Sequence, residues 1–295
     1  MATITETYVD YAGYRTYCKL VGERTPGKAP LLMLHGGPGG THDSLLTYAA
    51  IADRFGRQVV FYDQIGGGRS AIPHQEDDFY TTDLWLDEFY AVREALDLDD
   101  YHLFGNSWGG MIGLLAMLKD DSGCRSFVIN SAPVCITTWL EEANRLIGWL
   151  PREQQEAIAR AEATGSYDDP LYGAAMGEYY RRHVIGDVLA QMDPAELAAM
   201  SEQGESYYVM QGASEFVCTG KLRDWDIRAD LPRIKVPCMF LSGTDDECTP
   251  YAAKECVDAI PGCEWTLIQG APHLANIAKP EECIAAVEGF VSRFD

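Results

Sequence analysis

The feature of this sequence that most limits its fold is a serine held between two glycines. The segment Gly105-Asn-Ser107-Trp-Gly109 follows a strand-like run, 101–104, and precedes a helix-like run, 109–119. A turn that joins a strand to a helix so abruptly strains the backbone of the serine, and its neighbours must be glycine to avoid clashes. The hydroxyl is then exposed at a helix N-terminus, where the dipole stabilises developing negative charge. The segment predicts a strand–turn–helix unit built around a nucleophilic Ser107.

Short apolar runs recur along the chain and alternate with helix-like stretches. Strands that are apolar throughout and interleaved with helices indicate a mostly parallel sheet covered by helices on both faces. Residues 7–20 alternate apolar and polar side chains around Gly13, which predicts an antiparallel hairpin at the sheet edge. The predicted fold class is therefore α/β. The sequence places strands at 31–34, 59–62, 101–104, 127–129, 238–241 and 265–268, and helices near 81–97, 109–119 and 280–294.

Residues 135–231 break this rhythm. Trp139, Leu140, Ala143, Leu146, Ile147 and Leu150 recur at helical spacing, and Pro151 is placed to open a further helix. A helical block inserted into a β–α–β chain indicates a cap over the carboxyl edge of the sheet. The predicted organisation is a core formed by 1–134 and 232–295, with a helical cap at 135–231.

Charge and cysteine content limit the kinds of partner and compartment that we expect for this protein. The chain has 23 basic and 45 acidic side chains, a net charge of −22, which disfavours nucleic acid and anionic membranes as partners. No apolar run is long enough for a membrane span, and the N-terminus has no secretory signal pattern. Nine cysteines without a Cys-x-x-Cys pair argue against a zinc site and a disulfide framework, and favour a reducing cytoplasm.

A serine nucleophile needs a base, and six histidines are available. His273 lies in a loop after the last predicted strand, in Gly270-Ala-Pro-His273, from where it can reach back over the turn. In the α/β-hydrolase fold the acid lies between serine and histidine in the chain. Asp245, Asp246 and Glu247 follow the strand at 238–241, and spacing from Gly243 favours Asp246 over Asp245.

The oxyanion of an acyl-transfer reaction needs two backbone donors. The N–H of Trp108, directly after the nucleophile, is one candidate. The other is Gly37, in the loop His35-Gly-Gly-Pro-Gly-Gly40 after an early strand, where glycines allow a substrate to approach the backbone closely. These groups need neither a metal nor a cofactor, and we expect none.

Three motifs together resemble the proline iminopeptidase family of α/β-hydrolases. They are His35-Gly-Gly-Pro-Gly39, Asp63-Gln64-x-Gly-x-Gly68-x-Ser70 and Gly105-Asn-Ser107-Trp-Gly-Gly110. The resemblance runs from the edge hairpin to the final helix. The segment Ser214-Glu215-Phe216-Val-Cys-Thr219-Gly220-Lys-Leu-Arg-Asp224-Trp225-Asp226 is most similar to tricorn-interacting aminopeptidases and related L-amino acid amidases.

The resemblance implies a serine aminopeptidase that acts on a small peptide or an amino acid amide with a free α-ammonium group. Matched by position, Glu215 and Glu247 are the carboxylates that hold the ammonium, and a carboxylate pair suits that task. Tyr207 lies where the family has a pocket tyrosine. Asp63 and Gln64 are expected to brace the oxyanion loop rather than to touch substrate.

Two other readings remain open from the sequence. A carboxylesterase on the same scaffold would need an apolar acyl pocket without the paired glutamates. A non-catalytic binding protein could lose members of the triad, but Ser107, Asp246 and His273 are all present. Dehalogenase and epoxide hydrolase chemistry needs a carboxylate nucleophile, which Ser107 argues against. The sequence does not rank proline against other N-terminal residues, or peptides against amides.

Overall fold

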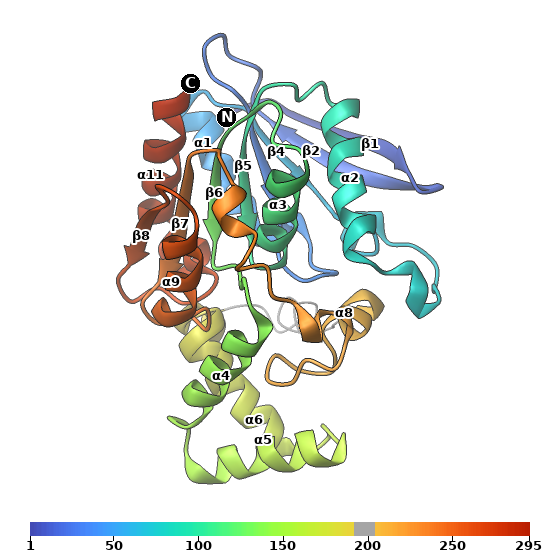
Figure 1. The fold of residues 1–295 in the computed structure, drawn as a ribbon, viewed down its shortest axis with the longest axis vertical. Helices are drawn as coiled ribbons and strands as arrows, with labels where there is room; N and C mark the ends of the chain where they lie inside the picture. The colour runs from blue at the N-terminus through green and yellow to red at the C-terminus, as the bar shows by residue number, and fades with distance from the viewer. Residues whose placement is uncertain (192–203) are drawn as a thin grey trace.

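A single eight-stranded sheet organises the protein (Figure 1). The computed structural model describes residues 1–191 and 204–295. The strand order is β1-β2-β4-β3-β5-β6-β7-β8. The pairs β1–β2 and β2–β4 are antiparallel, and every later pair in this order, from β4–β3 to β7–β8, is parallel. The strands are β1 Ile4–Tyr11, β2 Tyr14–Val21, β3 Leu31–Leu34, β4 Val59–Tyr62, β5 Tyr101–Asn106, β6 Cys124–Asn130, β7 Cys238–Gly243 and β8 Glu264–Ile268.

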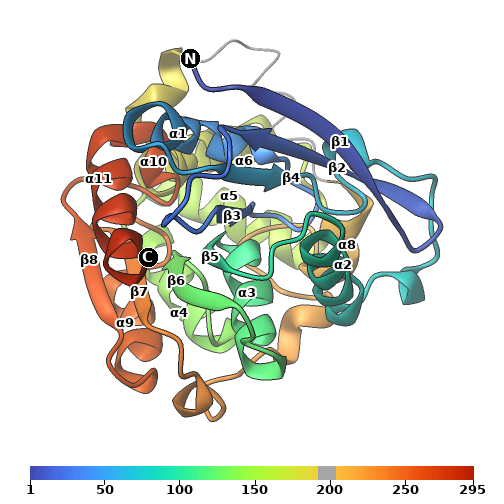
Figure 2. The same cartoon turned by 90° about the horizontal axis from the view of Figure 1, so that it is seen from above.

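The central strands are buried because helices cover both faces of the sheet, as Figure 2 shows from above. Apolar side chains of α2 (Thr82–Ala95), α3 (Trp108–Lys119) and α9 (Pro250–Ala259) pack in one core cluster. Those of α1 (Ala50–Phe55) and α11 (Pro280–Val291) pack in a second cluster on the other face. The short helix α10 (Ala275–Ala278) precedes α11. The predicted α/β class, the edge hairpin and the covered parallel sheet are confirmed.

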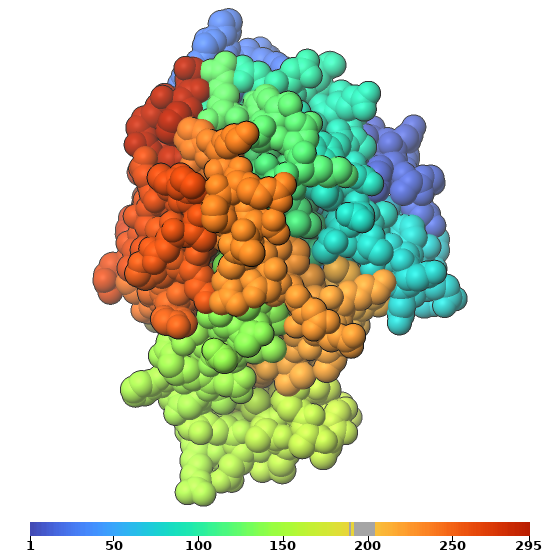
Figure 3. Space-filling view, in the orientation of Figure 1, coloured from blue at the N-terminus to red at the C-terminus, as the bar shows by residue number. Residues whose placement is uncertain are grey.

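The described helices between β6 and β7 gather at one end of the sheet, and in the space-filling view the yellow-green part of this segment projects from the body as a lobe (Figures 1 and 3). They are α4 (Ile136–Ile147), α5 (Arg152–Thr164), α6 (Pro170–Tyr179) and α8 (Glu205–Met210), with a π-helical turn at Tyr180–Val184. This segment has its own apolar cluster, which also takes in Leu274 beside His273. The part of the predicted cap at 192–203 lies outside the described residues.

Candidate active site

Ser107 occupies a strained turn between β5 and α3. Its φ of 52° and ψ of −119° put a side chain where residues other than glycine rarely lie. A Cβ added at Gly105 would lie 2.5 Å from the carbonyl oxygen of Gly109, and one added at Gly109 would lie 2.3 Å from that of Leu34. The turn therefore requires both glycines. The backbone N–H of Ser107 donates to the carbonyl of Asn130 at 2.8 Å, which anchors the turn to β6.

Two backbone N–H groups near Ser107 are available to an oxyanion. Trp108 is the first residue of α3, so its N–H has no acceptor within the helix. The loop after β3 comes close to the serine, because a Cβ added at Gly36 would lie 3.3 Å from the Cβ of Ser107. Among the hydrogen bonds of the described residues, the N–H groups of Gly37 and Trp108 donate to no acceptor. The φ of 133° at Gly37 is open only to glycine.

Gln64 joins the two halves of this arrangement. Its side-chain amide donates to the carbonyl of His35 at 2.8 Å, and its backbone N–H donates to Nε2 of His35 at 3.0 Å. Its side-chain oxygen accepts the indole N–H of Trp108 at 2.9 Å. Asp63 accepts from the backbone N–H of His42 at 2.8 Å, just beyond the glycine loop. Asp63 and Gln64 thus brace the loop and the start of α3.

Asp246 and His273, the acid and the base expected from the sequence, lie in direct contact. Nδ1 of His273 lies 2.9 Å from Oδ1 of Asp246, and both side chains are buried. A carboxylate only accepts, so Nδ1 carries the proton and Nε2 is free to act as a base. Asp245, the other candidate from the sequence, is exposed and makes no contact with the imidazole. Among the described hydrogen bonds, none joins the hydroxyl of Ser107 to His273; such bonds are often long before substrate binds.

Ser131, which sequence reasoning missed, holds Asp246 from the neighbouring strand. Its hydroxyl donates to Oδ2 of Asp246 at 2.5 Å, and the side chain of Asn130 donates to the Ser131 hydroxyl at 2.9 Å. Ser131 has a positive φ of 52° directly after β6. The backbone N–H of Cys248 adds a bond of 2.7 Å to Oδ1. Asp246 is therefore fixed by several donors in a buried site.

Glu215 and Glu247 converge beside the imidazole. Glu247 is buried, its Oε1 lies 4.0 Å from Nδ1 of His273, and its Oε2 has no hydrogen-bond partner in the described part of the chain. Glu215 is partly buried and accepts a hydrogen bond from the hydroxyl of Tyr207. Burial and the charge of Glu215 raise the pKa of Glu247, and burial raises that of Glu215 against the opposing bond from Tyr207. Two carboxylates so placed would be compensated by a cation.

The same charges act on His273. Burial alone would lower its pKa, but Asp246, Glu247 and Glu215 outweigh burial and raise the pKa to about 9. The ring of Trp139 from α4 meets the imidazole edge-on, with ring centroids 5.9 Å apart. The imidazole of His273 thus has acidic groups and an aromatic ring as neighbours.

Tyrosines of the helical segment surround the glutamates. The charges of both glutamates, together with burial, raise the pKa values of Tyr179, Tyr180 and Tyr207. The ring of Phe216, next to Glu215, packs against Tyr179 at 4.8 Å. Tyr207, for which the family resemblance implies a place in the pocket, lies against Glu215. Tyr179 had no signal in the sequence beyond being one aromatic residue in a helix.

Other classes of site find no support among the described residues. In 1–191 and 204–295, no three His, Cys, Asp or Glu side chains lie together as a metal ion would need. Within the same ranges no helix is long and apolar enough to cross a bilayer. All nine cysteines, each at a described position, are free thiols.

The fold and the turn at Ser107 define an α/β hydrolase, and residues 29–280 match the family model described as "alpha/beta hydrolase fold". The chain is 38% identical to a proline iminopeptidase of Lactobacillus delbrueckii subsp. lactis, over 96% of this chain and 97% of that protein. It is 36% identical to one of Lactobacillus helveticus, with 99% of each chain covered. The crystal structure of proline iminopeptidase from Mycobacterium smegmatis superposes with a TM-score of 0.89 at 35% identity, covering 98% of each chain. The chain belongs to the proline iminopeptidase family.

Proposed function

We propose that this enzyme is a serine aminopeptidase that releases N-terminal proline from short peptides, with Ser107 as nucleophile. The observation that carries the proposal is the convergence of Glu215 and Glu247 beside His273, with a buried oxygen of Glu247 left without a partner. Buried carboxylates are costly unless a positive group compensates them. The α-ammonium of a substrate is that group, and the relatives named as proline iminopeptidases supply the choice of proline.

The chemistry follows from the positions of the groups. The ammonium is held by both glutamates, which sets the scissile carbonyl against Ser107. Nε2 of His273 takes the hydroxyl proton as the oxygen attacks, and the tetrahedral oxyanion accepts from the N–H groups of Gly37 and Trp108. The imidazolium then gives its proton to the leaving amine as the C–N bond breaks. Water repeats the sequence on the acyl-enzyme, which releases the free amino acid.

We further propose residues 135–231 as a substrate-enclosing cap and the cytoplasm as the compartment. Glu215, Tyr179 and Tyr207 all come from this segment, so the segment contributes one side of the amine subsite. Nine free cysteines suit a reducing compartment.

The test compares prolyl arylamide, N-acetyl-prolyl arylamide and a small neutral ester, with other aminoacyl arylamides as a specificity panel. Hydrogen bonds to a charged group are worth roughly 1.5–3 kcal/mol, so Glu215→Gln and Glu247→Gln should each lower kcat/KM on the prolyl substrate about 10- to 150-fold. At the pH where each variant is fully active, the ester should be affected little. Glu255→Gln, on α9 and bonded to Thr138, is the matched control.

The free prolyl substrate should be turned over far faster than the acetylated one, and prolyl arylamide faster than the rest of the panel. Equal rates on free and acetylated substrates would refute the amine subsite and favour a carboxylesterase. A faster aminoacyl substrate of another kind would refute only the choice of proline.

A further inference from the structure

A π-helical turn connects the helical segment to the loops that bear Glu247 and His273. The turn at Tyr180–Val184 follows α6 directly, and the N–H of Ile185 donates to the carbonyl of Tyr180 at 2.8 Å, the i+5 bond of a π-turn. Such turns are rare and frequently mark functional sites. Here the turn presents His183 to the loops that bear Asp246, Glu247 and His273.

The backbone carbonyl of His183 joins two of these loops. It accepts the N–H of His273 at 2.9 Å and the N–H of Glu247 at 3.2 Å. The next carbonyl, of Val184, accepts the N–H of Leu274 at 2.8 Å. One peptide group of the cap thus fixes the spacing between the base and the adjacent glutamate.

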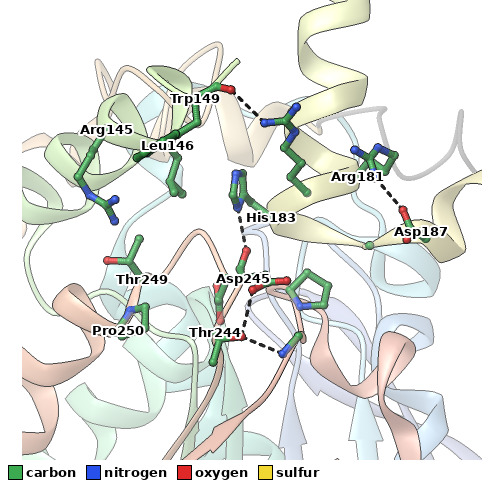
Figure 4. A pocket seen from close by; sticks show the side chains of 15 residues that line it. Arg145, Leu146, Trp149, Arg181, His183, Asp187, Thr244, Asp245, Thr249 and Pro250 are labelled. Atoms are coloured by element: carbon green, nitrogen blue, oxygen red, sulfur yellow. Dashed lines mark hydrogen bonds and ion pairs between the residues drawn. The ribbon is translucent and has the colours of Figure 1, made fainter. Parts of the chain in front are cut away.

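The side chain of His183 contacts the backbone next to Asp246, the remaining residue of the three. Its Nδ1 lies 2.8 Å from the carbonyl oxygen of Asp245, the residue before Asp246 (Figure 4). A carbonyl only accepts, so Nδ1 carries the proton. The ring lies against Tyr179 with centroids 5.2 Å apart, and Nε2 is buried without a hydrogen-bond partner among the described residues. This imidazole lines a cavity of about 450 Å³ whose lining includes Asp246 but neither Ser107 nor Glu215.

Burial of His183 favours the neutral form of its imidazole. Burial lowers its pKa, and Arg182 adds to this, whereas the carbonyl of Asp245 and the carboxylates of Asp245 and Asp246 oppose it. A neutral imidazole with its proton on Nδ1 is a fixed donor. It does not compete with His273 for the negative charge of Asp246.

We propose that His183 is a positioning residue: its ring fixes the Asp245 carbonyl and so orients Asp246 toward His273, while its ring contact with Tyr179 supports the wall beside Glu247. It touches no substrate and acts through these residues. The proposal rests on the proposed function for the role of Glu247, but its effect on the Asp246–His273 pair needs only a serine hydrolase.

Two substitutions separate the parts of this role. His183→Phe keeps an aromatic ring but removes the donor. His183→Asn keeps a donor where Nδ1 stands and removes the ring contact. Trp149→Phe, on the rim of the same cavity and 70% exposed, is the control for disturbance of the cavity alone. The readouts are kcat and KM on prolyl arylamide and on a neutral ester from pH 5 to 10, with Tm for each variant.

His183→Phe should lower kcat on both substrates about 3- to 10-fold, the order expected for one lost neutral hydrogen bond. The acid limb of the ester profile should move to lower pH, because a looser Asp246 raises the pKa of His273 less; Glu247 and Glu215 face the same imidazole and are unchanged. His183→Asn should restore kcat and the pH limb but leave KM for the prolyl substrate raised. The control should match the wild type.

Unchanged profiles in His183→Phe would overturn the proposal. So would equal losses in the Phe and Asn variants that follow their Tm values, because a merely structural role predicts that result. Equal wild-type rates on free and acetylated substrates would contradict the amine subsite alone. The ester profile would still decide the role of His183.

Discussion

Oε1 of Glu247 lies 4.0 Å from Nδ1 of His273, so the proposed amine-binding group and the proposed base share one electrostatic environment. Any change in the charge of one alters the protonation of the other. The pH dependence of the enzyme therefore reports on substrate binding as well as on the base.

Glu247→Gln should move the acid limb of kcat/KM for a neutral ester to lower pH by about one pH unit. The base works only when unprotonated, and the pKa of His273 is raised to about 9, so wild-type activity should increase as the pH rises through that value. Loss of one negative charge lowers this pKa. A pH–rate profile of the variant measures the shift, and a limb that stays in place would show that Glu247 does not act on the base.

A bound ammonium should have the same effect as that substitution. In the complex the substrate's positive charge offsets Glu215 and Glu247, so the acid limb of kcat should lie below that of kcat/KM for prolyl arylamide. For a neutral ester the two limbs should coincide. Coincident limbs for both substrates would contradict the placement of the ammonium at the glutamates.

Ser107→Ala should reduce turnover by a factor of about 10⁴ or more, because removal of the nucleophile leaves only binding and oxyanion stabilisation. A fluorophosphonate probe should label the wild type at Ser107 and leave the variant unlabelled. Ser122→Ala, at an exposed position, is the matched control and should behave as the wild type in both assays. Near-normal turnover by a folded Ser107→Ala protein would reject the mechanism.

Ser131→Ala should remove a direct hydrogen-bond donor to the carboxylate of Asp246. Its hydroxyl donates to Oδ2 of Asp246 at 2.5 Å, so its removal leaves a buried carboxylate oxygen short of a donor. Without that donor the carboxylate holds a proton on His273 more strongly, and the acid limb for the ester should move to higher pH, opposite to Glu247→Gln. We expect kcat to fall roughly 10-fold. Ser131→Thr, which keeps the hydroxyl, tests whether the loss follows the hydrogen bond.

Activity should survive dialysis against EDTA, because an imidazole and a carboxylate suffice to activate a serine hydroxyl. Turnover of prolyl arylamide before and after dialysis, and after addition of zinc or manganese, is the measurement. A loss that metal restores would contradict this prediction.

The stability of the folded protein should also depend on pH, because of Glu88 on α2. The carboxyl is fully buried, which raises its pKa to about 8, although it accepts the Ile65 N–H at 2.9 Å and the hydroxyl of Thr16. A raised carboxyl pKa means that the folded state keeps its proton, so the contribution to stability is full below about 4.5 and is lost as the pH rises through about 8. Glu88→Gln should therefore raise Tm at pH 9 relative to the wild type and change it little at pH 4.5.

Much of the fold could be predicted because its signals are local. The strands at Leu31–Leu34 and Val59–Tyr62 are buried on both faces, so each reads as an unbroken apolar run with clear ends. Ser107 could be found because Gly105 and Gly109 flank it in the sequence. His273 and Asp246 were then chosen by their positions after Ser107 in the chain. The helix Pro250–Ala259 was missed although Thr249 caps it.

Ser131 and His183 could not be found in the same way. Ser131 reaches Asp246 because β6 and β7 are neighbours in the sheet. The two residues are 115 positions apart in the chain. The contacts of His183 with the loops involve main-chain carbonyls, its own and that of Asp245, and every residue has such a carbonyl. The position of a π-turn also depends on packing, so no side-chain pattern in the sequence predicted it.

The π-turn at Tyr180–Val184 also limits how related chains can vary in length. Each residue of an α-helix advances the chain by about 100°, so deletion of one residue inside this turn would restore regular winding and rotate His183 away from the loops. Insertions and deletions in the loop between α5 and α6, whose residues Gly165 and Ser166 are exposed, leave that winding untouched. Homologues should therefore differ in length at the far end of the helical lobe and keep the residue count of this turn constant.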